Sequence, residues 1–345
     1  MVTIDGSAGE GGGQILRTSL VLSAITGTPV RIERIRARRP KPGLQRQHLV
    51  AVQAAARVSG AHLTGAELNS CAVEFTPQKS TLRALAGTYE FDIGTAGSTT
   101  LVLQTVMPIL WHAEGPSTVT IRGGTHNGMS PPVEFLQDCF LPVLQRIGVN
   151  TAVELQRYGF YPAGGGAIQA LIQPWITHAP LELLERGKFI DRHAEVLLAN
   201  LPAHIASREA LAFKHALHWS QREVEEREVP AHGPGNAILA RLRFANIATR
   251  CTAVGELRKT AEAVAVDCAK QIECYLATDA PVCEHLADQL LLPLALGAGG
   301  TFRTADLSEH TRTNAAIIAQ FMGQVVSFTK QVAGGWLVAV QRRNR

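Results

Sequence analysis

The chain contains 345 residues, of which 46% are hydrophobic and 18% are charged, and its formal net charge is +4. A chain of this length and hydrophobic content can bury a large core, in one large domain or in two ordinary ones. The weak positive charge argues against a surface that wraps a nucleic-acid duplex, so any nucleic-acid contact is expected in a local cleft.

The cysteines and the first residues indicate a compartment. The six cysteines form neither a CxxC pair nor a Cys/His spacing typical of zinc, so we interpret them as reduced, mostly buried thiols. The start MVTIDGSAGE lacks the basic and apolar regions of a secretory leader. The most apolar stretches, such as LVLQTVMPILW, are too short to span a bilayer. We therefore expect a cytoplasmic enzyme with no membrane partner.

A glycine-rich segment, GSAGEGGGQ, occupies residues 6–14 and leads into an apolar helix. Its backbone N–H groups and the positive end of the helix dipole make phosphate the expected ligand. The Gly-Lys-Ser/Thr ending of a P-loop is missing, which excludes the standard triphosphate cradle. Glu10 can hold a divalent metal, because Mg²⁺ takes one or two protein carboxylates and leaves its other positions to phosphate and water. Alternatively, Glu10 only caps the helix.

The segment RIERIRARRPKPGLQR, residues 31–46, carries seven Arg or Lys residues against a single acid. Guanidinium groups bind phosphate oxygens bidentately, so this segment is a second candidate for phosphate binding. Pro40 and Pro42 keep the chain extended until the next helix, which Gln47 and His48 begin. From charge alone, a solvated basic face explains the segment equally well.

A weak internal repeat organises the chain. A glycine loop that feeds an apolar helix, which ends at glycines before a strand, occurs at residues 9–35 and 93–124, and part of the same pattern recurs at 288–304. A second amphipathic helix and short alternating strands follow each copy. The second helices are expected at residues 47–60, 131–149 and 312–324. The predicted fold class is α/β, with three repeated strand-helix-strand-helix-strand-strand units that form a large domain.

Three units of about 85 residues leave roughly ninety residues over. The pattern breaks after GFYPAGGGAIQALIQP, and two further helices, at 203–217 and 256–277, flank a strand at 238–246. We interpret this region as a smaller inserted α/β domain, since insertions are tolerated where chain ends lie close together. The predicted domains are residues 1–183 plus 277–345 for the catalytic body and 184–276 for the insertion.

His310 lies in DLSEHTRTN, directly before the last amphipathic helix. The positive end of a helix dipole favours a neutral imidazole, and a neutral imidazole can form a covalent phosphoramidate with a nucleotide. The chain has twelve histidines, and most histidines are exposed or structural. The position alone therefore does not single out His310.

Seven motifs in order make a more specific case. GEGGGQILR, RARRPKPGLQRQH, IGTAGSTTLVLQT, GFYPAGGG, GPGN, HLADQLLLPLALGAG and EHTRTN, spread over nearly all of the chain, resemble the RNA 3′-terminal phosphate cyclase family. The resemblance implies the three-repeat fold with an insertion. It also implies a reaction in which ATP adenylates a histidine with loss of pyrophosphate. AMP then moves to an RNA 3′-phosphate, and the 2′-hydroxyl closes a 2′,3′-cyclic phosphate with release of AMP.

The same resemblance implies roles for individual residues. His310 matches the adenylated nucleophile, and Glu10, with Mg²⁺ or Mn²⁺, matches the metal ligand. The polar set around the phosphates and the RNA end is Arg17, Arg36, Arg39, Gln47 and His48. The positions near the nucleotide are Gln14, Gln104, Pro131, Phe135, His285, Leu286, Ala287, Asp288 and Gln289. Relatives carry Tyr where this chain has His285, which offers less stacking area to adenine.

Two other functions stay open from the sequence. One is an RNA-processing scaffold, because some cyclase-like proteins lack the histidine and have no activity. The other is a carboxyvinyl transferase, because such enzymes are built from similar repeats. The presence of His310, Glu10 and the arginines argues against the scaffold. Expected partners are ATP and RNA 3′-phosphate ends; the sequence leaves a homodimer and the role of the insertion open.

Overall fold

A computed structural model of the chain describes residues 1–345 except 79–83, 333 and 343–345. The fold is mixed α/β, and the strands of the described residues form four sheets of four strands each. None of the helices among those residues is both long and apolar enough to cross a membrane.

The first sheet contains the N-terminal strands in the order β1-β2-β4-β3. β1 and β2 are parallel, and the other two pairs are antiparallel. Helices α1 and α2 both end at a glycine with φ +68°, a conformation that glycine adopts without strain. The bounds are β1 Val2–Asp5, α1 Gly13–Thr26, β2 Val30–Glu33, α2 Arg46–Ser59, β3 His62–Thr64 and β4 Val73–Thr76.

The second sheet has the order β5-β6-β8-β7, with β5 and β6 parallel and the remaining pairs antiparallel. The Ser98 side chain caps α3 by accepting a hydrogen bond from the Leu101 N–H. The helix expected at 131–149 is a run of three helical pieces, the middle one a π-helix. The bounds are β5 Thr88–Asp92, α3 Thr99–Leu110, β6 Ser117–Gly123, α4 Val133–Phe135, π-helix Leu136–Phe140, α5 Leu141–Arg146, β7 Thr151–Arg157 and β8 Gly166–Ile172.

The third sheet joins strands from two distant parts of the chain in the order β15-β16-β14-β9. β9 and β14 are parallel, and β16 is antiparallel to both of its neighbours. The bounds are β9 Leu181–Leu183, α8 Glu284–Leu296, β14 Gly300–Thr304, α9 Glu309–Met322, β15 Val326–Lys330 and β16 Trp336–Val340.

The fourth sheet lies between β9 and α8 in sequence and has the order β11-β10-β12-β13. Helix α7 begins at Ala261 and not at residue 256 as expected, because Thr260 caps it by accepting from the Ala263 N–H. The bounds are β10 Phe189–Ala199, α6 His204–Leu217, a 3₁₀ turn Gln221–Glu223, β11 Val224–Glu228, β12 Gly235–Phe244, β13 Ala248–Val254 and α7 Ala261–Leu276.

The helices of the first three sheets contact one another in the centre of the molecule, where α1 touches α2, α3 and α9, and α8 touches α9. Their apolar side chains belong to one large cluster that also includes residues of the three sheets. α6 and α7 pack on the fourth sheet around a separate cluster that contains Phe213 and Ile272. Apolar burial therefore has two main centres.

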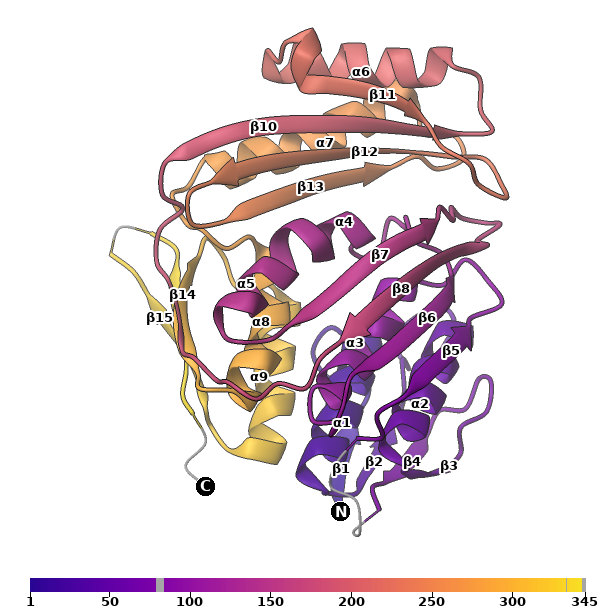
Figure 1. The fold of residues 1–345 in the computed structure, drawn as a ribbon, viewed down its shortest axis with the longest axis vertical. Coiled ribbons are helices and arrows are strands. Elements are labelled where there is room, and N and C mark those ends of the chain that lie inside the picture. The colour runs from indigo at the N-terminus through magenta and orange to yellow at the C-terminus, as the bar shows by residue number, and fades with distance from the viewer. Residues whose placement is uncertain (79–83, 333, 343–345) are drawn as a thin grey trace.

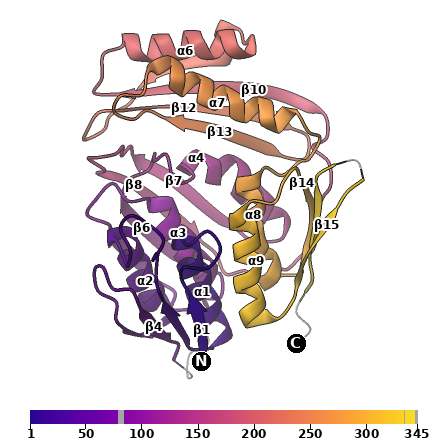
Figure 2. The ribbon, with the colours of Figure 1, turned by 180° about the vertical axis from the view of Figure 1, so that it is seen from behind.

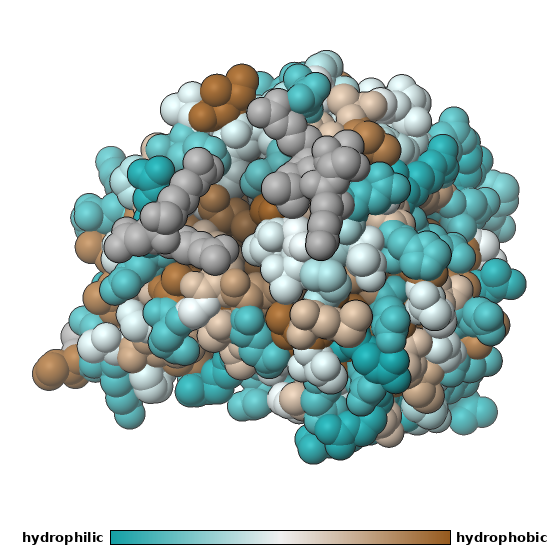
Figure 3. Space-filling view, turned by 90° about the horizontal axis from the view of Figure 1, so that it is seen from below, coloured by the Kyte–Doolittle hydropathy of each residue, from teal (hydrophilic) through white to brown (hydrophobic). Residues whose placement is uncertain are grey.

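The fourth sheet and its two helices lie at one end of the molecule, above α4 and β7 (Figure 1). β1, the first strand of the chain, lies toward the opposite end, as the view from behind also shows (Figure 2). Seen from that end, hydrophilic residues dominate the rim and hydrophobic residues are scattered among them (Figure 3). The segment from β10 to α7, Phe189–Leu276, is called the inserted unit because it lies between β9 and α8 in sequence, and the rest is called the main body.

Candidate active site

Two neighbouring cavities share His310, Gln14 and Arg17 in their walls. The larger has a volume of about 1460 Å³ and is bordered by the glycine loop, the basic segment and the inserted unit. The smaller has a volume of about 680 Å³ and is bordered by α1, α3, α8, the loop before α4 and, from the inserted unit, β13 and α7. His310 therefore stands where two cavities meet.

His310 is the second residue of α9, whose first turn is capped by the Ser308 side chain. The His310 side chain is 52% exposed. Nδ1 lies 2.7 Å from Oε1 of Gln14, and an amide oxygen only accepts hydrogen bonds, so Nδ1 carries the proton. In that tautomer the other ring nitrogen, Nε2, keeps a free lone pair, as a nucleophile requires.

The orientation of the Gln14 amide is set by Asp288. Nε2 of Gln14 donates to Oδ2 of Asp288 at 2.8 Å, which leaves Oε1 to face His310. Burial raises the pKa of Asp288 to about 7, against the attraction of Arg17 and the hydrogen bond from Gln14. Asn314 donates to the Asp288 carbonyl at 2.7 Å, which ties α9 to α8.

Glu10 projects from the glycine loop with only 7% of its side chain exposed. Arg39 donates to Oε2 at 2.5 Å and to the Glu10 carbonyl at 3.1 Å. The Glu10 N–H donates to Oγ1 of Thr313 at 3.3 Å, so the loop is held against α9. Gly9 permits this contact, because it has φ +51° and an added Cβ would lie 2.1 Å from Thr313 Oγ1.

The other carboxylate oxygen of Glu10, Oε1, is buried without a hydrogen-bond partner and lies 3.9 Å from Nδ1 of His310. A buried carboxylate oxygen with no partner is costly unless a cation meets it. Among the described residues no cluster of three or more His, Cys, Asp or Glu side chains could hold a metal. The single unpartnered oxygen of Glu10 fits a hard ion that takes one protein carboxylate and fills its other positions with phosphate and water.

The basic residues of the larger cavity crowd together. Burial and the charges of Arg36 and Arg17 lower the pKa of His48 to about 3, so this imidazole is neutral at physiological pH. Its Nδ1 is buried without a partner. Burial and neighbouring Arg39 lower the pKa of Arg36, whose backbone has φ +54°. Cations that repel one another and are partly desolvated bind a polyanion favourably, because the anion relieves the repulsion.

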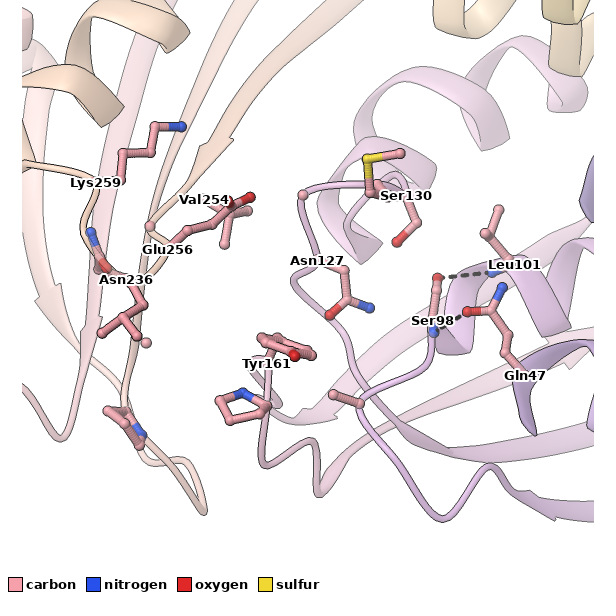
Figure 4. Close-up of a pocket in the computed structure, with 18 of the residues that line it drawn as sticks. Gln47, Ser98, Leu101, Asn127, Ser130, Tyr161, Asn236, Val254, Glu256 and Lys259 are labelled. Atoms are coloured by element: carbon pink, nitrogen blue, oxygen red, sulfur yellow. Dashed lines mark hydrogen bonds between the residues drawn. The ribbon is translucent and has the colours of Figure 1, made fainter. Parts of the chain in front are cut away.

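Gln47, at the start of α2, contacts the glycine-containing segment that leads into α3. Its Oε1 accepts from the N–H of Ser98 at 2.7 Å, at the start of α3 (Figure 4). An added Cβ at Gly97 would lie 3.0 Å from the Gln47 Cβ, so glycine allows the two segments to meet. The contact places a second helix N-terminus on the wall of the larger cavity.

The smaller cavity contains most of the predicted nucleotide positions. Nε2 of Gln104 donates to Oε1 of Gln289 at 2.6 Å, and Gln289 in turn donates to the His285 carbonyl at 2.9 Å. Phe135 is 3% exposed and Pro131 is at the start of the helical run, so one side of the cavity is apolar. The His285 side chain lies at the edge of this cavity and is 66% exposed.

Leu286 and Ala287 differ from the other predicted positions. Their side chains are 1% and 0% exposed and belong to the large apolar cluster. Neither residue borders the two cavities, whereas all the other predicted site residues border at least one of them.

Several cavity residues had no assigned role in the sequence analysis. On the main body they are Asn127 and Ser130, from the loop after β6, and Tyr161, from the loop between β7 and β8. On the inserted unit they include Asn236, Val254, Glu256 and Lys259, which face them across the cavity (Figure 4). The motifs GFYPAGGG and GPGN contain two of these residues, but nothing in the residue types alone connects the two loops.

The fold and the cation-lined cavities around an imidazole define an enzyme that handles phosphate groups. The sequence model of the RNA 3′-terminal phosphate cyclase family matches residues 8–328, so the chain belongs to this family, which uses ATP. A protein described as RNA 3′-terminal phosphate cyclase, from Koribacter versatilis (strain Ellin345), is 48% identical over 323 residues. The similarity covers 93% of this chain and 90% of that relative.

Proposed function

We propose that this chain is an ATP-dependent RNA 3′-terminal phosphate cyclase. Nε2 of His310 attacks the α-phosphorus of ATP, a P–N bond forms, and pyrophosphate leaves. An oxygen of the RNA 3′-phosphate then displaces the imidazole from the AMP phosphorus and forms a phosphoanhydride. The neighbouring 2′-hydroxyl attacks the RNA phosphorus, loses its proton, and expels AMP as the 2′,3′-cyclic phosphate forms.

The observation that carries the proposal is the location of His310 between two cavities of different chemistry. The smaller, with its apolar wall at Phe135 and the amides of Gln104 and Gln289, suits an adenine base and ribose. The larger, with Arg36 and Arg39, suits phosphates and an RNA end. An imidazole that borders both cavities can receive AMP from one side and pass it to the other.

The residues around His310 account for the first transfer. Gln14 keeps the proton on Nδ1, which leaves Nε2 free to attack. Charge that develops on the leaving pyrophosphate is stabilised by Arg17, Arg36 and the backbone amides at the start of α1. Because these groups are held in place before the reaction, they need little reorganisation.

Glu10 would hold a divalent metal, Mg²⁺ or Mn²⁺, through one carboxylate oxygen. A bound ion there supplies positive charge that neutralises the phosphates beside His310. Arg39 binds the other carboxylate oxygen of Glu10 and so orients the one that is free.

Activation by AMP explains the use of ATP, because a phosphomonoester dianion is a poor electrophile until it becomes part of an anhydride. Cyclisation then needs little beyond orientation, because the 2′-hydroxyl is tethered to its target. A DNA 3′-phosphate can receive AMP but has no hydroxyl with which to cyclise.

The direct test is intact mass measurement after incubation with ATP and Mg²⁺ in the absence of RNA. The wild type is expected to gain the mass of AMP in an acid-labile adduct, and His310→Ala is expected to gain none. An adduct of equal yield on the variant would show that another residue is the nucleophile. Addition of a 3′-phosphorylated oligoribonucleotide to the wild-type adduct is expected to release AMP and yield a phosphatase-resistant end.

The same assay separates the other two functions. A scaffold forms no adduct and leaves the RNA end sensitive to phosphatase. A carboxyvinyl transferase needs neither ATP nor a histidine nucleophile. ATP-dependent, RNA-dependent turnover that requires His310 therefore excludes both.

We also infer that the three sheets of the main body are copies of one unit. Support comes from the strand orders β1-β2-β4-β3, β5-β6-β8-β7 and β9-β14-β16-β15, each with one parallel pair followed by two antiparallel pairs. The proposed domains are residues 1–183 plus 277–345 and an insertion at 184–276; the two larger apolar clusters support this division, and a third, smaller cluster joins Phe160 to the fourth sheet. Circular dichroism and calorimetry of an isolated 184–276 fragment test whether the insertion folds by itself.

A further inference from the structure

The larger cavity extends well beyond the groups needed for ATP. Its volume of about 1460 Å³ exceeds the roughly 300–1,000 Å³ of a usual small-molecule site. One wall is the catalytic one, with Glu10, Arg36 and His310, and the opposite wall belongs to the inserted unit. In Figure 4, Asn127 and Tyr161 of the main body face Asn236 and Glu256 of the inserted unit across the cavity.

Tyr161 presents an aromatic ring to this space. Its side chain borders the cavity, and the residue is 76% exposed, which is unusual for a large aromatic residue. The loop that carries it is anchored, because Tyr158 forms a parallel bridge with Ala231 of the inserted unit. An accessible ring on an anchored loop is a platform on which a base can stack.

Within the described part of the chain, the inserted unit contributes an unpaired cation to the wall of the same cavity. Arg208 is paired with Glu262 at 2.7 Å and Lys259 with Asp267 at 2.8 Å. Arg258 is exposed on the same wall and has no acidic partner among the residues that the structure describes. Its φ of +71° lies in a region that non-glycine residues rarely adopt and that is frequent at binding sites.

Resting on the proposed cyclase function, we propose that this outer part of the larger cavity binds the single-stranded RNA nucleotides immediately 5′ of the terminal nucleotide. A base stacks on Tyr161, and a backbone phosphate contacts Arg258. The combination of an aromatic platform and a cationic wall is the one by which proteins hold single strands with little sequence preference. The inserted unit thereby forms one side of the RNA path.

The experiment compares substrates that do and do not reach the outer part of the cavity. We would measure kcat/KM for adenosine 3′-phosphate and for 3′-phosphorylated di-, tri- and hexaribonucleotides. For the wild type, kcat/KM is expected to rise from the mononucleotide to the trimer and then level off. Tyr161→Ala is expected to lower the trimer-to-mononucleotide ratio by about fivefold or more, whereas Tyr161→Phe keeps the ring and the ratio.

Arg258→Ala is expected to lower the same ratio and to reduce the salt dependence of log KM for the trimer by about 0.7, the contribution of one phosphate contact on a single strand. Arg222→Ala, which removes an exposed cation outside the cavity, is the matched control. Equilibrium binding of a labelled trimer 3′-phosphate without ATP gives a second measure that does not depend on turnover.

The proposal is overturned if the wild type shows no preference for the trimer, or if Tyr161→Ala lowers trimer and mononucleotide turnover equally. Failure of the cyclase function itself looks different, because no substrate would then yield a cyclic end and no AMP adduct would form. AMP-adduct formation without RNA, measured for each variant, reports whether that variant is folded and active in the first half-reaction.

Discussion

The Gln14 side chain connects a buried carboxylate to the proposed nucleophile. It donates to Asp288 and accepts from Nδ1 of His310, at 2.8 and 2.7 Å. An amide can do both only in one orientation, so the ionised carboxylate determines which imidazole nitrogen is free. A carboxylate that orients a catalytic histidine directly is familiar from hydrolase triads, and here an amide lies between the two groups.

Removal of this amide should affect chemistry more than nucleotide binding. Gln14→Ala is expected to slow formation of the AMP adduct by roughly 10–100-fold, the usual effect of losing a group that orients a functional histidine. The KM for ATP should change much less, because most of the residues that line the proposed adenosine site lie outside α1. Pre-steady-state mass spectrometry at several ATP concentrations separates the rate of adduct formation from the affinity for ATP. An equal decrease in the rate and in the affinity would contradict the orienting role.

The raised pKa of Asp288 predicts how adduct formation depends on pH. Below its pKa of about 7 the carboxyl is protonated and can donate to Oε1 of Gln14 when the amide turns over, which presents Nε2 of Gln14 in place of Oε1 to Nδ1 of His310. The rate is therefore expected to increase as the pH rises from about 6 to 8. Asp288→Asn should be slower and should lose the inflection near pH 7, and the pH profile of single-turnover adenylation is the measurement. An unchanged inflection in the variant would assign it to another group.

The residue types at the site were readable from the sequence, but their partners were not. Glu10 in a glycine loop and the arginines of residues 31–46 already indicated phosphate and metal. The bonds of Gln14 to Asp288 and to His310 span 274 and 296 positions along the chain. No local pattern encodes contacts of that separation, so the orienting role of Gln14 became visible only in the folded protein.

At the scale of elements, the glycine loop is held by the last helix. Gly9 has a positive φ and lies so close to Thr313 that a side chain at this position would clash. The N–H of Glu10 donates to the same threonine, in the first turns of α9. The loop that presents Glu10 and the helix that presents His310 are thus fixed relative to each other.

Helix α6 of the inserted unit contains a buried acid that should make stability depend on pH. Glu209 is 0% exposed; Asn236 donates to Oε1, and Oε2 has no partner. Burial raises the pKa of Glu209 to about 8. Between the usual carboxyl pKa and pH 8 the folded state holds one proton more than the unfolded state, so the free energy of unfolding falls as pH rises through that range.

Glu209→Gln removes this titration while keeping an acceptor for Asn236. The variant is expected to unfold with nearly the same free energy as the wild type at pH 5 and to be more stable by about 1–3 kcal/mol at pH 8. Urea denaturation at the two pH values measures the difference. An equal difference at both would contradict the assignment, because a pure packing change does not depend on pH.

Helix and strand positions followed closely from periodicity and glycines. The expected helix at 203–217 is α6, His204–Leu217, and the expected start of a helix at Gln47 and His48 is within one residue of α2. The start of α7 was wrong by five residues, since Thr260 offers a better N-cap than the charged residues before it. The π-helical turn at Leu136–Phe140 had no sequence signal.

At the scale of the molecule, the inserted unit is joined to the main body by an ion pair across their boundary. Arg250 of β13 is 9% exposed and donates from Nε to Oδ2 of Asp138, on the π-helix of the main body, at 2.8 Å. Arg250 also borders the smaller cavity. The pair therefore connects the position of the inserted unit to the proposed nucleotide site.

Arg250→Ala leaves Asp138 without its main partner at this boundary. The free energy of unfolding is expected to fall by about 3 kcal/mol, as when one member of a buried pair is removed, and the KM for ATP is expected to rise. Arg31→Ala, which breaks an exposed ion pair in β2, should leave the free energy of unfolding and the KM for ATP nearly unchanged. Denaturation curves measure the stability, and steady-state kinetics measure the KM for ATP. A loss of stability without any change in KM would show that the Arg250–Asp138 pair does not influence the proposed nucleotide site.

Short-range information in the chain was enough for the α/β class, the candidate phosphate-binding segments and the family. Periodicity, glycine geometry and the affinity of arginine for phosphate act within a few residues, and for that reason they can be read in one dimension. Three features arise only from packing between segments that are distant in the sequence. They are the meeting of two cavities at His310, the hydrogen bonds through Gln14 and the cavity wall formed by the inserted unit. Such convergence depends on how whole sheets and helices fit together, which no single stretch of sequence specifies.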